Sequence, residues 1–284
     1  MNTALISDRH GNGIDFDRIQ AHYDVGDDFY ALFLDESMTY SCGKFDSPET
    51  TLAEAQRAKI DLSLGKCELR PGMTLLDIGC GWGATAFRAA ERYGAKVTGL
   101  TLSQNQYAYA QRRAAGHDDI EFRLEGWETF DGHADRIISI GAFEHFGHAK
   151  YGAFFEKCRQ ILPDDGVMLL HSITWGRPSA DEEFFGFIMF LATEIFPGGE
   201  LPEPEAIVEQ ARHHGFELVH AESLRPHYAR TLDCWTANLE THRDMAVGLV
   251  GAERYDMYIR YLTGAAARFR SGEVDVYQFK LRVA

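Results

Sequence analysis

The stretch that decides the fold is LLDIGCGWG, residues 75–83. It begins as a short apolar run, reaches Asp77, and continues with glycines at 79, 81 and 83. A short apolar run bounded by glycines is typical of a buried strand. Glycines after a strand let the backbone turn sharply and approach a ligand closely. We therefore expect a strand, a tight ligand-binding turn and then a helix.

The spacing of this turn indicates the kind of ligand. From Asp77 it reads D-x-G-x-G-x-G, whereas dinucleotide sites read G-x-G-x-x-G and place a pyrophosphate on a helix N-terminus. The present spacing suits a compact zwitterion, the amino-acid part of S-adenosylmethionine, with Asp77 and the nearby backbone as polar partners. A purely structural strand-to-helix turn is the alternative.

Around this stretch, apolar runs alternate with amphipathic segments, which predicts a parallel α/β sheet with ligands at the carboxyl ends of its strands. The strands are expected over 72–79, 95–103, 120–127, 134–143 and 166–175, and the helices over 84–94, 104–116 and 150–162. Residues 16–66 read as helices with loops, 176–215 as helix and loop, and 255–283 as helix, turn and a last strand that joins the sheet. We expect one domain over 1–284, with parts at 1–66, 67–175, 176–215 and 216–284.

Composition excludes several classes of protein. The chain has 284 residues and is 45% apolar, so it can bury a sizeable core. Its net charge of −15 disfavours nucleic acid as the main partner, because the phosphate backbone is also negative. Five scattered cysteines without a C-x-x-C argue against a disulfide framework or a structural zinc site. The first 15 residues lack an apolar signal region, and the longest apolar stretch, 184–196, is too short to span a bilayer, so we expect a cytoplasmic protein.

The loops after the second and third strands supply further candidates. The acid that often binds ribose hydroxyls after the second strand is missing from GLTLSQNQ (99–106), and Thr101 and Gln106 are the obvious polar substitutes. Trp127, followed by Glu128, comes after the third strand. A large aromatic side chain there can cover an adenine face, although Trp127 could equally be a core residue.

GAFEHFGH (141–148) follows the fourth strand and holds a carboxylate and two histidines within five residues. If a helix begins there, Glu144 and His148 share one face and His145 lies about 100° away. This differs from H-E-x-x-H, in which two histidines share the face, so a metal site is disfavoured and both histidines are expected to be structural. A metal-dependent protein that uses these three residues remains an alternative.

Six segments, in order, resemble the mycolic acid cyclopropane synthases, which belong to the wider cyclopropane-fatty-acid synthase family. They are HYDVGDDFYALFLDESMTYSC (22–42), LLDIGCGWG, GLTLSQNQ, DRIISIGAFEHFGH (135–148), EIFPGG (194–199) and RPHYARTLDCW (225–235). The likeness runs from about residue 20 to the C-terminus. It implies the class I methyltransferase fold, an α/β, mostly parallel sheet flanked by helices, with N-terminal helices and an inserted helical segment that cover the active site. It also implies methyl transfer from S-adenosylmethionine to an isolated double bond of a long acyl chain, ending in a cyclopropane.

The resemblance also assigns residues. It implies cofactor contacts at Tyr40, Ser41, Gly79, Gly81, Thr101, Leu102, Gln106, Trp127 and Glu128. It implies a bound bicarbonate ion held by Cys42, Ile140 (through its backbone), Glu144, His171 and Tyr228. Candidates to line the acyl chain or face the cation are Tyr23, Phe196, Leu232, Tyr261 and Ala265, and Tyr40 joins them as an aromatic face. The implied partner is an unsaturated acyl chain on an acyl carrier protein, with room for a peripheral membrane contact and no indication of oligomeric state.

The chemistry explains why such residues are needed. Methyl transfer to an alkene leaves a carbocation, so the protein must align the reactants, exclude water and place a base near the new methyl group. His171 and the Tyr228 hydroxyl can donate to an anion, and Glu144 can share a proton or orient His171. Two departures bear on the substrate: the family pattern YLTGC reads YLTGA here (261–265), and segment 176–193 is shorter than usual.

Three other outcomes remain open beside cyclopropane formation. The same transfer could end in a methyl branch beside a hydroxyl group. The chain could instead methylate an oxygen or nitrogen of a small molecule, or bind lipid without catalysis. Only the last alternative predicts that the cofactor does not bind.

Overall fold

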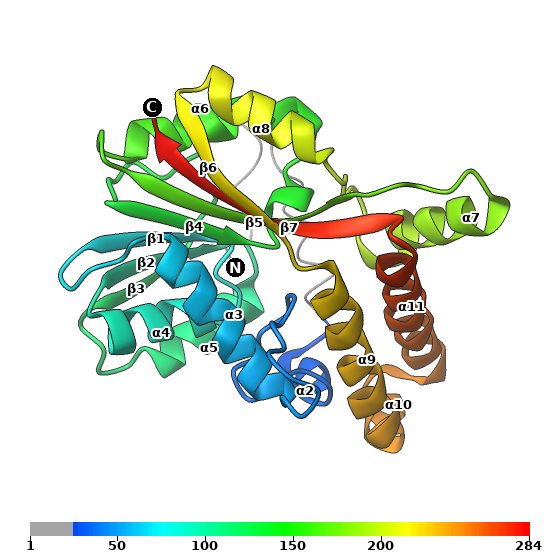
Figure 1. Ribbon diagram of the computed structural model, residues 1–284. Helices are drawn as coiled ribbons and strands as arrows, with labels where there is room; N and C mark the ends of the chain where they lie inside the picture. Colours follow the sequence, from blue (N-terminus) through cyan, green and yellow to red (C-terminus); the bar gives the residue numbers. More distant parts are fainter. Residues whose placement is uncertain (1–24) are drawn as a thin grey trace, which may run out of the picture.

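The computed structural model describes residues 25–284, and a seven-stranded sheet forms the centre of this part of the chain (Figure 1). Its strand order is β3-β2-β1-β4-β5-β7-β6, and neighbouring strands from β3 to β5 run parallel. β7 is antiparallel to both β5 and β6. The strands are β1 (Thr74–Ile78), β2 (Lys96–Thr101), β3 (Ile120–Leu124), β4 (Arg136–Ile140), β5 (Val167–Trp175), β6 (Phe216–Ser223) and β7 (Val274–Val283).

Helices cover both faces of the sheet, and a further group of helices extends from one end of it (Figure 1). α6 (Tyr151–Ile161) and α8 (Pro204–His213) lie on one face, and α3 (Leu52–Lys66), α4 (Ala84–Tyr93) and α5 (Gln104–Arg113) lie on the other. The group at the end contains α9 (Arg225–Thr241), α10 (Arg243–Val250) and α11 (Ala252–Ser271), with the short α2 (Asp27–Ala31) against α10. The expected α/β arrangement is therefore present.

α3 matters most for the site because its inner side faces the sheet. It begins with a capping box in which the Thr51 hydroxyl accepts from the Glu54 amide and the Glu54 carboxylate accepts from the Thr51 amide. Such a reciprocal pair satisfies two backbone donors at the helix start and fixes where the helix begins. Lys59 and Ser63, polar residues of this helix, are fully or almost fully buried.

An aromatic core joins the N-terminal segment to the C-terminal helices. Tyr30, Phe33, Trp235 and Tyr258 are almost fully buried there, with ring centroids between 6.2 and 6.5 Å apart in the pairs Phe33–Trp235, Phe33–Tyr258 and Tyr30–Tyr258. Edge-to-face packing of this kind adds to the burial of the rings. The core thereby fixes α2, α9 and α11 as one wall beside the sheet.

The longest apolar stretch of the sequence forms a protruding helix. α7 (Glu182–Phe190) projects away from the sheet and continues as the π-helical turn η3 (Leu191–Ile195) (Figure 1). Phe187 and Phe190 are buried, whereas Phe185 and Met189 on the other side are 58% and 61% exposed. Within residues 25–284, no helix is both long enough and apolar enough to cross a membrane.

No continuous helix begins at Glu144, so the helical arrangement considered for Glu144, His145 and His148 does not apply. The chain forms two separate 3-10 turns, η1 (Phe143–His145) and η2 (His148–Lys150), with Gly147 between them at φ 79°. That backbone angle favours glycine and cannot occur inside a right-handed helix. Glu144 is consequently buried while His148 points to solvent, so the two side chains do not share a helix face.

Other expectations differ from the structure at their ends or by omission. The five parallel strands are present but shorter than the apolar runs suggested, because the flanking residues form the turns at the sheet edges. β6 was not expected from the sequence, since its residues are mostly exposed and polar at the edge of the sheet. Only α2 represents the helices expected before residue 48 among the described residues, and Tyr23 lies outside the part that the structure describes.

Candidate functional site

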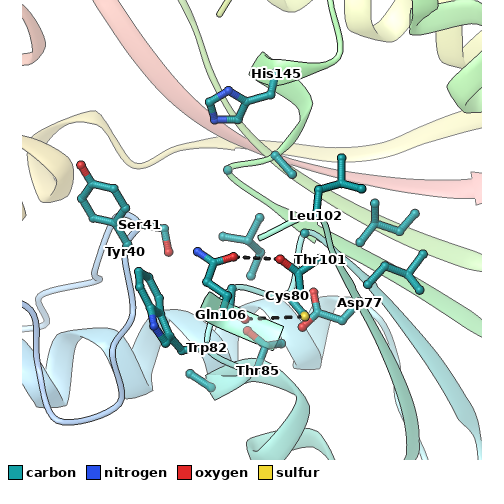
Figure 2. Close-up of a pocket in the computed structure, with 18 of the residues that line it drawn as sticks. Tyr40, Ser41, Asp77, Cys80, Trp82, Thr85, Thr101, Leu102, Gln106 and His145 are labelled. Carbon is teal, nitrogen blue, oxygen red and sulfur yellow. Dashed lines mark hydrogen bonds between the residues drawn. The ribbon is translucent and has the colours of Figure 1, made fainter. Parts of the chain in front are cut away.

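The turn between β1 and α4 forms the floor of a first cavity, of about 120 Å³, at the carboxyl edge of the sheet (Figure 2). Gly79, Gly81 and Gly83 all have positive φ angles, between 56° and 91°. A Cβ atom on Gly79 would lie 2.4 Å from the Cβ atom of Ala142. Both the backbone angle and the close approach therefore require glycine at position 79.

Asp77 provides a buried carboxyl group in the wall of this cavity. Burial raises its pKa to about 7, and the nearby Lys59 ammonium partly counteracts that rise. Its Oδ2 atom has no hydrogen-bond partner among the described residues. A buried acceptor without a partner is costly unless a ligand supplies a donor, so Asp77 can receive a ligand's N–H or O–H group.

The loop after β2 supplies the polar side of the cavity. The Thr101 hydroxyl donates to Gln106 Oε1 at 2.9 Å, and the Ser103 hydroxyl caps α5 by accepting from the Gln106 amide (Figure 2). Leu102 lies between them on the cavity wall. The two polar residues expected to replace the missing acid are thus held together at the cavity.

The loop after β3 contributes an aromatic wall. Trp127 is buried against Phe146 and Phe154, with ring centroids 5.6 and 5.3 Å away, and it borders the cavity. Trp127 is therefore both a core residue and part of the cavity wall. Glu128 is not part of this wall, and its carboxylate accepts from Lys150 at 3.2 Å.

A second cavity, of about 350 Å³, lies beside the first and is mainly apolar. Its walls come from β5, α7, η3, α9 and α11. Four of the five expected acyl-facing residues border it, namely Phe196, Leu232, Tyr261 and Ala265. The apolar lining of this cavity therefore suits an apolar chain far better than a polar ligand.

The two cavities share part of their wall, formed by Tyr40, Ser41, Gly141 and His145. The Tyr40 hydroxyl donates to the Tyr261 hydroxyl at 3.2 Å, and burial raises the pKa of Tyr40 well above its usual value. Ser41 accepts a hydrogen bond from the buried Lys59 at 2.7 Å. A ligand in one cavity and a ligand in the other would therefore meet at this shared wall.

Glu144 brings a second buried carboxyl group to the site, on the wall of the apolar cavity. Its Oε1 atom accepts from the Ile173 amide at 2.5 Å, and its Oε2 atom has no partner within residues 25–284. Burial raises the pKa of Glu144 to about 7, although backbone hydrogen bonds lower it in part. The carboxyl group can therefore gain or lose a proton near neutral pH.

The other four residues expected to hold an anion are distributed unevenly. His171 and Tyr228 border the second cavity together with Glu144, and Ile140 borders the first. Cys42 lines neither cavity: it is fully buried, and its Sγ atom donates to the Gly43 carbonyl at 3.1 Å. Burial also raises the pKa of the Cys42 thiol, so that it stays protonated.

The two histidines of the GAFEHFGH segment have different surroundings. His145 borders both cavities, and burial lowers its pKa to about 4. His148 is half-exposed and pairs with Glu200 at 2.7 Å. Among residues 25–284, no three or more histidine, cysteine or acidic side chains lie close enough to hold a metal ion.

Some residues of the site were not expected from the sequence. Lys59 and Trp82 border the first cavity, and Gln278 contacts His171 from β7. Trp82 lies within the glycine-rich stretch 75–83 but was not singled out there. Nothing local marks Lys59 and Gln278, because they come from a helix and a strand that only the fold brings together. His145 had a signal, its position directly after Glu144, but its expected structural role gave no reason to place it at the junction.

Comparison with known proteins gives consistent matches over nearly the whole chain. A family model described as mycolic acid cyclopropane synthetase matches residues 11–279. Cyclopropane mycolic acid synthase 1 of Mycobacterium tuberculosis is 51% identical over 275 residues, which are 93% of this chain and 96% of that protein. The solved structure of the cyclopropane synthase MmaA2 from Mycobacterium tuberculosis superposes with a TM-score of 0.92 at 50% identity, covering 94% of this chain and 98% of the other. The mycolic acid cyclopropane synthase CmaA1, solved in complex with SAH and CTAB, gives a TM-score of 0.91 at 50% identity with the same coverage.

Proposed function

This chain belongs to the mycolic acid cyclopropane synthetase family and is an S-adenosylmethionine-dependent C-methyltransferase of the class I fold; we propose that it converts a double bond of a long, mycolic-acid-like acyl chain into a cyclopropane. The observation that carries this proposal is the pair of cavities that share a wall. One is built from backbone turns and polar groups, and the other from apolar side chains. A relative was solved with both SAH and CTAB, which supports one ligand for each cavity.

The first cavity has the groups that the cofactor requires. Asp77 offers a buried acceptor without a partner among residues 25–284, and the glycine turn leaves room for close approach of a ligand. Gln106, Thr101 and Trp127 would contact the more distant parts of the molecule. When bound, S-adenosylmethionine supplies the electrophilic methyl group.

The shared wall and the aromatic side chains of the second cavity beside it provide the surroundings for the reacting carbon atoms. Phe196 and Tyr261 pack edge-to-face with ring centroids 5.4 Å apart, and Tyr40 is hydrogen-bonded to Tyr261. Aromatic faces stabilise a neighbouring cation, and a mainly apolar cavity excludes the water that would trap it. These features favour ring closure over formation of an alcohol.

A bicarbonate ion fits the polar end of the second cavity. Glu144 Oε2 and His171 Nε2 have no hydrogen-bond partner in the described part of the chain, and both residues border this cavity. A bicarbonate ion carries one O–H donor and several acceptors, so it can pair with a carboxylate and with an N–H group at once. Glu144, His171 and Tyr228 would hold it, and the bound ion would supply a base for the proton that leaves the new methyl group.

The second candidate outcome is a methyl branch beside a hydroxyl group. His145 and Ser41 bring polar atoms to the shared wall, and a water molecule held there could capture the cation. Methylation of a heteroatom is a third outcome that uses the same cofactor cavity. We propose that an acyl carrier protein carries the acyl chain. The identity of the carrier does not decide which of these three outcomes occurs.

Incubation with methyl-labelled S-adenosylmethionine and paired acceptors tests the proposal. The acceptors are a cis-monounsaturated long-chain acyl thioester and its hydroxylated saturated analogue. We expect label only in the unsaturated chain, with a mass gain of one CH₂ group. A gain of CH₂ plus H₂O would establish the methyl-and-hydroxyl outcome, and label confined to the hydroxylated chain would overturn the proposal.

A further inference from the structure

A row of polar side chains crosses three strands beneath the second cavity. His171 on β5 lies directly opposite Gln278 on β7, and Gln278 lies directly opposite Glu222 on β6. His171 and Gln278 are almost completely buried. Side chains of directly paired residues on one face of a sheet are neighbours. This row therefore connects the second cavity to β6, at the edge of the sheet.

α3 covers this row with two polar residues. Lys66 donates to Gln278 Oε1 at 2.8 Å and also pairs with Glu222 at 2.5 Å. Ser63 accepts from Gln278 Nε2 at 2.9 Å, while its own hydroxyl donates to the Lys59 carbonyl at 2.7 Å. Gln278 is thereby held from both sides of its amide group.

These partners leave the Gln278 amide one orientation. A lysine ammonium group can only donate, so the atom facing Lys66 must be the amide oxygen. The Ser63 hydroxyl proton is already engaged, so Ser63 must accept, and the atom facing it is the amide nitrogen. Rotating the amide would place an N–H group against Lys66 and leave a buried donor unpaired.

The fixed amide determines the protonation of the neighbouring imidazole. The second N–H of Gln278 Nε2 points to His171 Nδ1, at 3.3 Å. His171 Nδ1 must then accept, and burial, reinforced by the Lys59 and Lys66 charges, lowers the pKa of His171 well below its usual value. The imidazole is neutral, so its proton lies on Nε2, the atom that has no partner within the described residues.

We propose that Lys66 and Gln278 are positioning residues that hold His171 in the Nε2–H tautomer, as a permanent hydrogen-bond donor to the second cavity. His171 then cannot accept the proton released during ring closure, because its cavity-facing nitrogen already carries one. The base must be another group, and His171 serves to bind and orient an anion there. This catalytic consequence rests on the proposed function, whereas the tautomer itself does not.

Imidazole ¹⁵N chemical shifts of the full-length protein, labelled at its histidines, test the tautomer directly. His171 is assigned by the signal that disappears in His171→Asn. We expect a neutral Nε2–H imidazole in the unsubstituted protein. A neutral Nδ1–H form or a doubly protonated ring would overturn the proposal.

Variants at the two positioning residues supply the second readout. Gln278→Glu places an acceptor opposite His171 Nδ1, so we expect the proton to move to Nδ1. Lys66→Met frees the amide, so we expect a mixture of tautomers. Gln278→Glu should lower methyl transfer to the unsaturated thioester about 10- to 100-fold, the value of a hydrogen bond to a charged group. Lys66→Met should lower it less, in proportion to the share of His171 that leaves the Nε2–H form. Affinity for S-adenosylhomocysteine, measured by calorimetry, should stay unchanged.

Lys280→Met is the matched control. Lys280 lies on β7, as Gln278 does, is about as buried as Lys66, and pairs with Glu68 as Lys66 pairs with Glu222. Within residues 25–284 it makes no hydrogen bond to Gln278. It should leave both the tautomer and the transfer rate unchanged. An Nε2–H signal that persists in Gln278→Glu, or a moved proton without slower transfer, would contradict the proposal. Absence of any transfer by the unsubstituted protein would instead defeat the proposed function and leave the tautomer result standing.

Discussion

The two cavities differ in how they are built, although each contains one buried carboxyl group. The first comes mainly from the ends of β1, β2, β3 and β4 and the turns that follow them, and residues 38–41 and Lys59 complete it. Its shape depends largely on backbone conformation at the glycine turn. The second is formed mainly by side chains from segments spread between residues 40 and 274. A backbone-built cavity tolerates little variation, whereas a side-chain-built cavity can change with each substitution. The first therefore defines the reaction class and the second defines the acceptor.

Replacing Glu144 should give the largest difference between the cavities. Glu144→Gln keeps the shape of the side chain but removes the charge and the exchangeable proton. We expect methyl transfer to the unsaturated thioester to fall about 100- to 10,000-fold, the range of acid–base assistance. Binding of S-adenosylhomocysteine, measured by calorimetry, should be unaffected.

Glu194→Gln is the control for this change, because Glu194 is exposed on η3 near the same cavity. It should transfer methyl groups at the normal rate. Full activity of Glu144→Gln with normal cofactor binding would remove Glu144 from the mechanism.

The converse change is Asp77→Asn in the first cavity. Loss of a charged acceptor should weaken S-adenosylhomocysteine binding by about 1.5–3 kcal/mol, roughly 10- to 100-fold. Saturating cofactor should restore part of the transfer rate, unlike in Glu144→Gln. Asp119→Asn, at an exposed position at the opposite end of the strands, should bind normally. Equal affinities for the Asp77 variant and the unsubstituted protein would show that the cofactor does not use this carboxyl group.

The two carboxyl groups also predict how stability depends on pH. Each has a pKa of about 7 in the folded protein, raised by burial, against about 4 when unfolded. The unfolded chain therefore loses these protons first as the pH rises. Their contribution to the free energy of unfolding should fall between pH 4 and 7, by up to about 1.4 kcal/mol per pH unit and carboxyl group. The unfolding temperature should fall less steeply between pH 4 and 7 in Asp77→Asn and in Glu144→Gln than in the unsubstituted protein. An unchanged slope in both variants would contradict the burial argument.

The smallest expected effect concerns the acceptor alone. Ala265→Phe adds bulk to the second cavity, and overpacking costs about 1–3 kcal/mol. We expect several-fold slower transfer to long chains, less slowing with short ones, and normal cofactor binding. Ala267→Phe, on the exposed side of the same helix, should behave like the unsubstituted protein. Chain-length dependence that is identical in both variants would place the acyl chain elsewhere.

The same difference explains what the sequence could predict. The parallel α/β sheet and the residues around Asp77 were accessible because strand, turn and helix follow one another within a short stretch, and the family resemblance identified the fold as that of the class I methyltransferases. The polar pair Thr101 and Gln106 was accessible for the same reason. These local patterns remain local in the folded chain.

The second cavity was harder to predict because its parts meet only in the fold. Gln278 reaches His171 through strand pairing, and β6 was missed because an exposed edge strand has no apolar run. The helical arrangement considered after Glu144 does not form, because Gly147 interrupts it and the Ile173 amide holds Glu144 inward. Family resemblance supplied Glu144, His171 and Tyr228, which border the second cavity. It also supplied Cys42 and Glu128, which border neither cavity.

The most direct test of the account is the deuterium content of the product made with trideuteromethyl-labelled S-adenosylmethionine and the cis-unsaturated acyl thioester. Ring closure removes one hydrogen from the transferred methyl group, so the account predicts a cyclopropane that has lost one deuterium atom. A product that retains every deuterium atom, whether as a methyl branch or on a heteroatom, would contradict it.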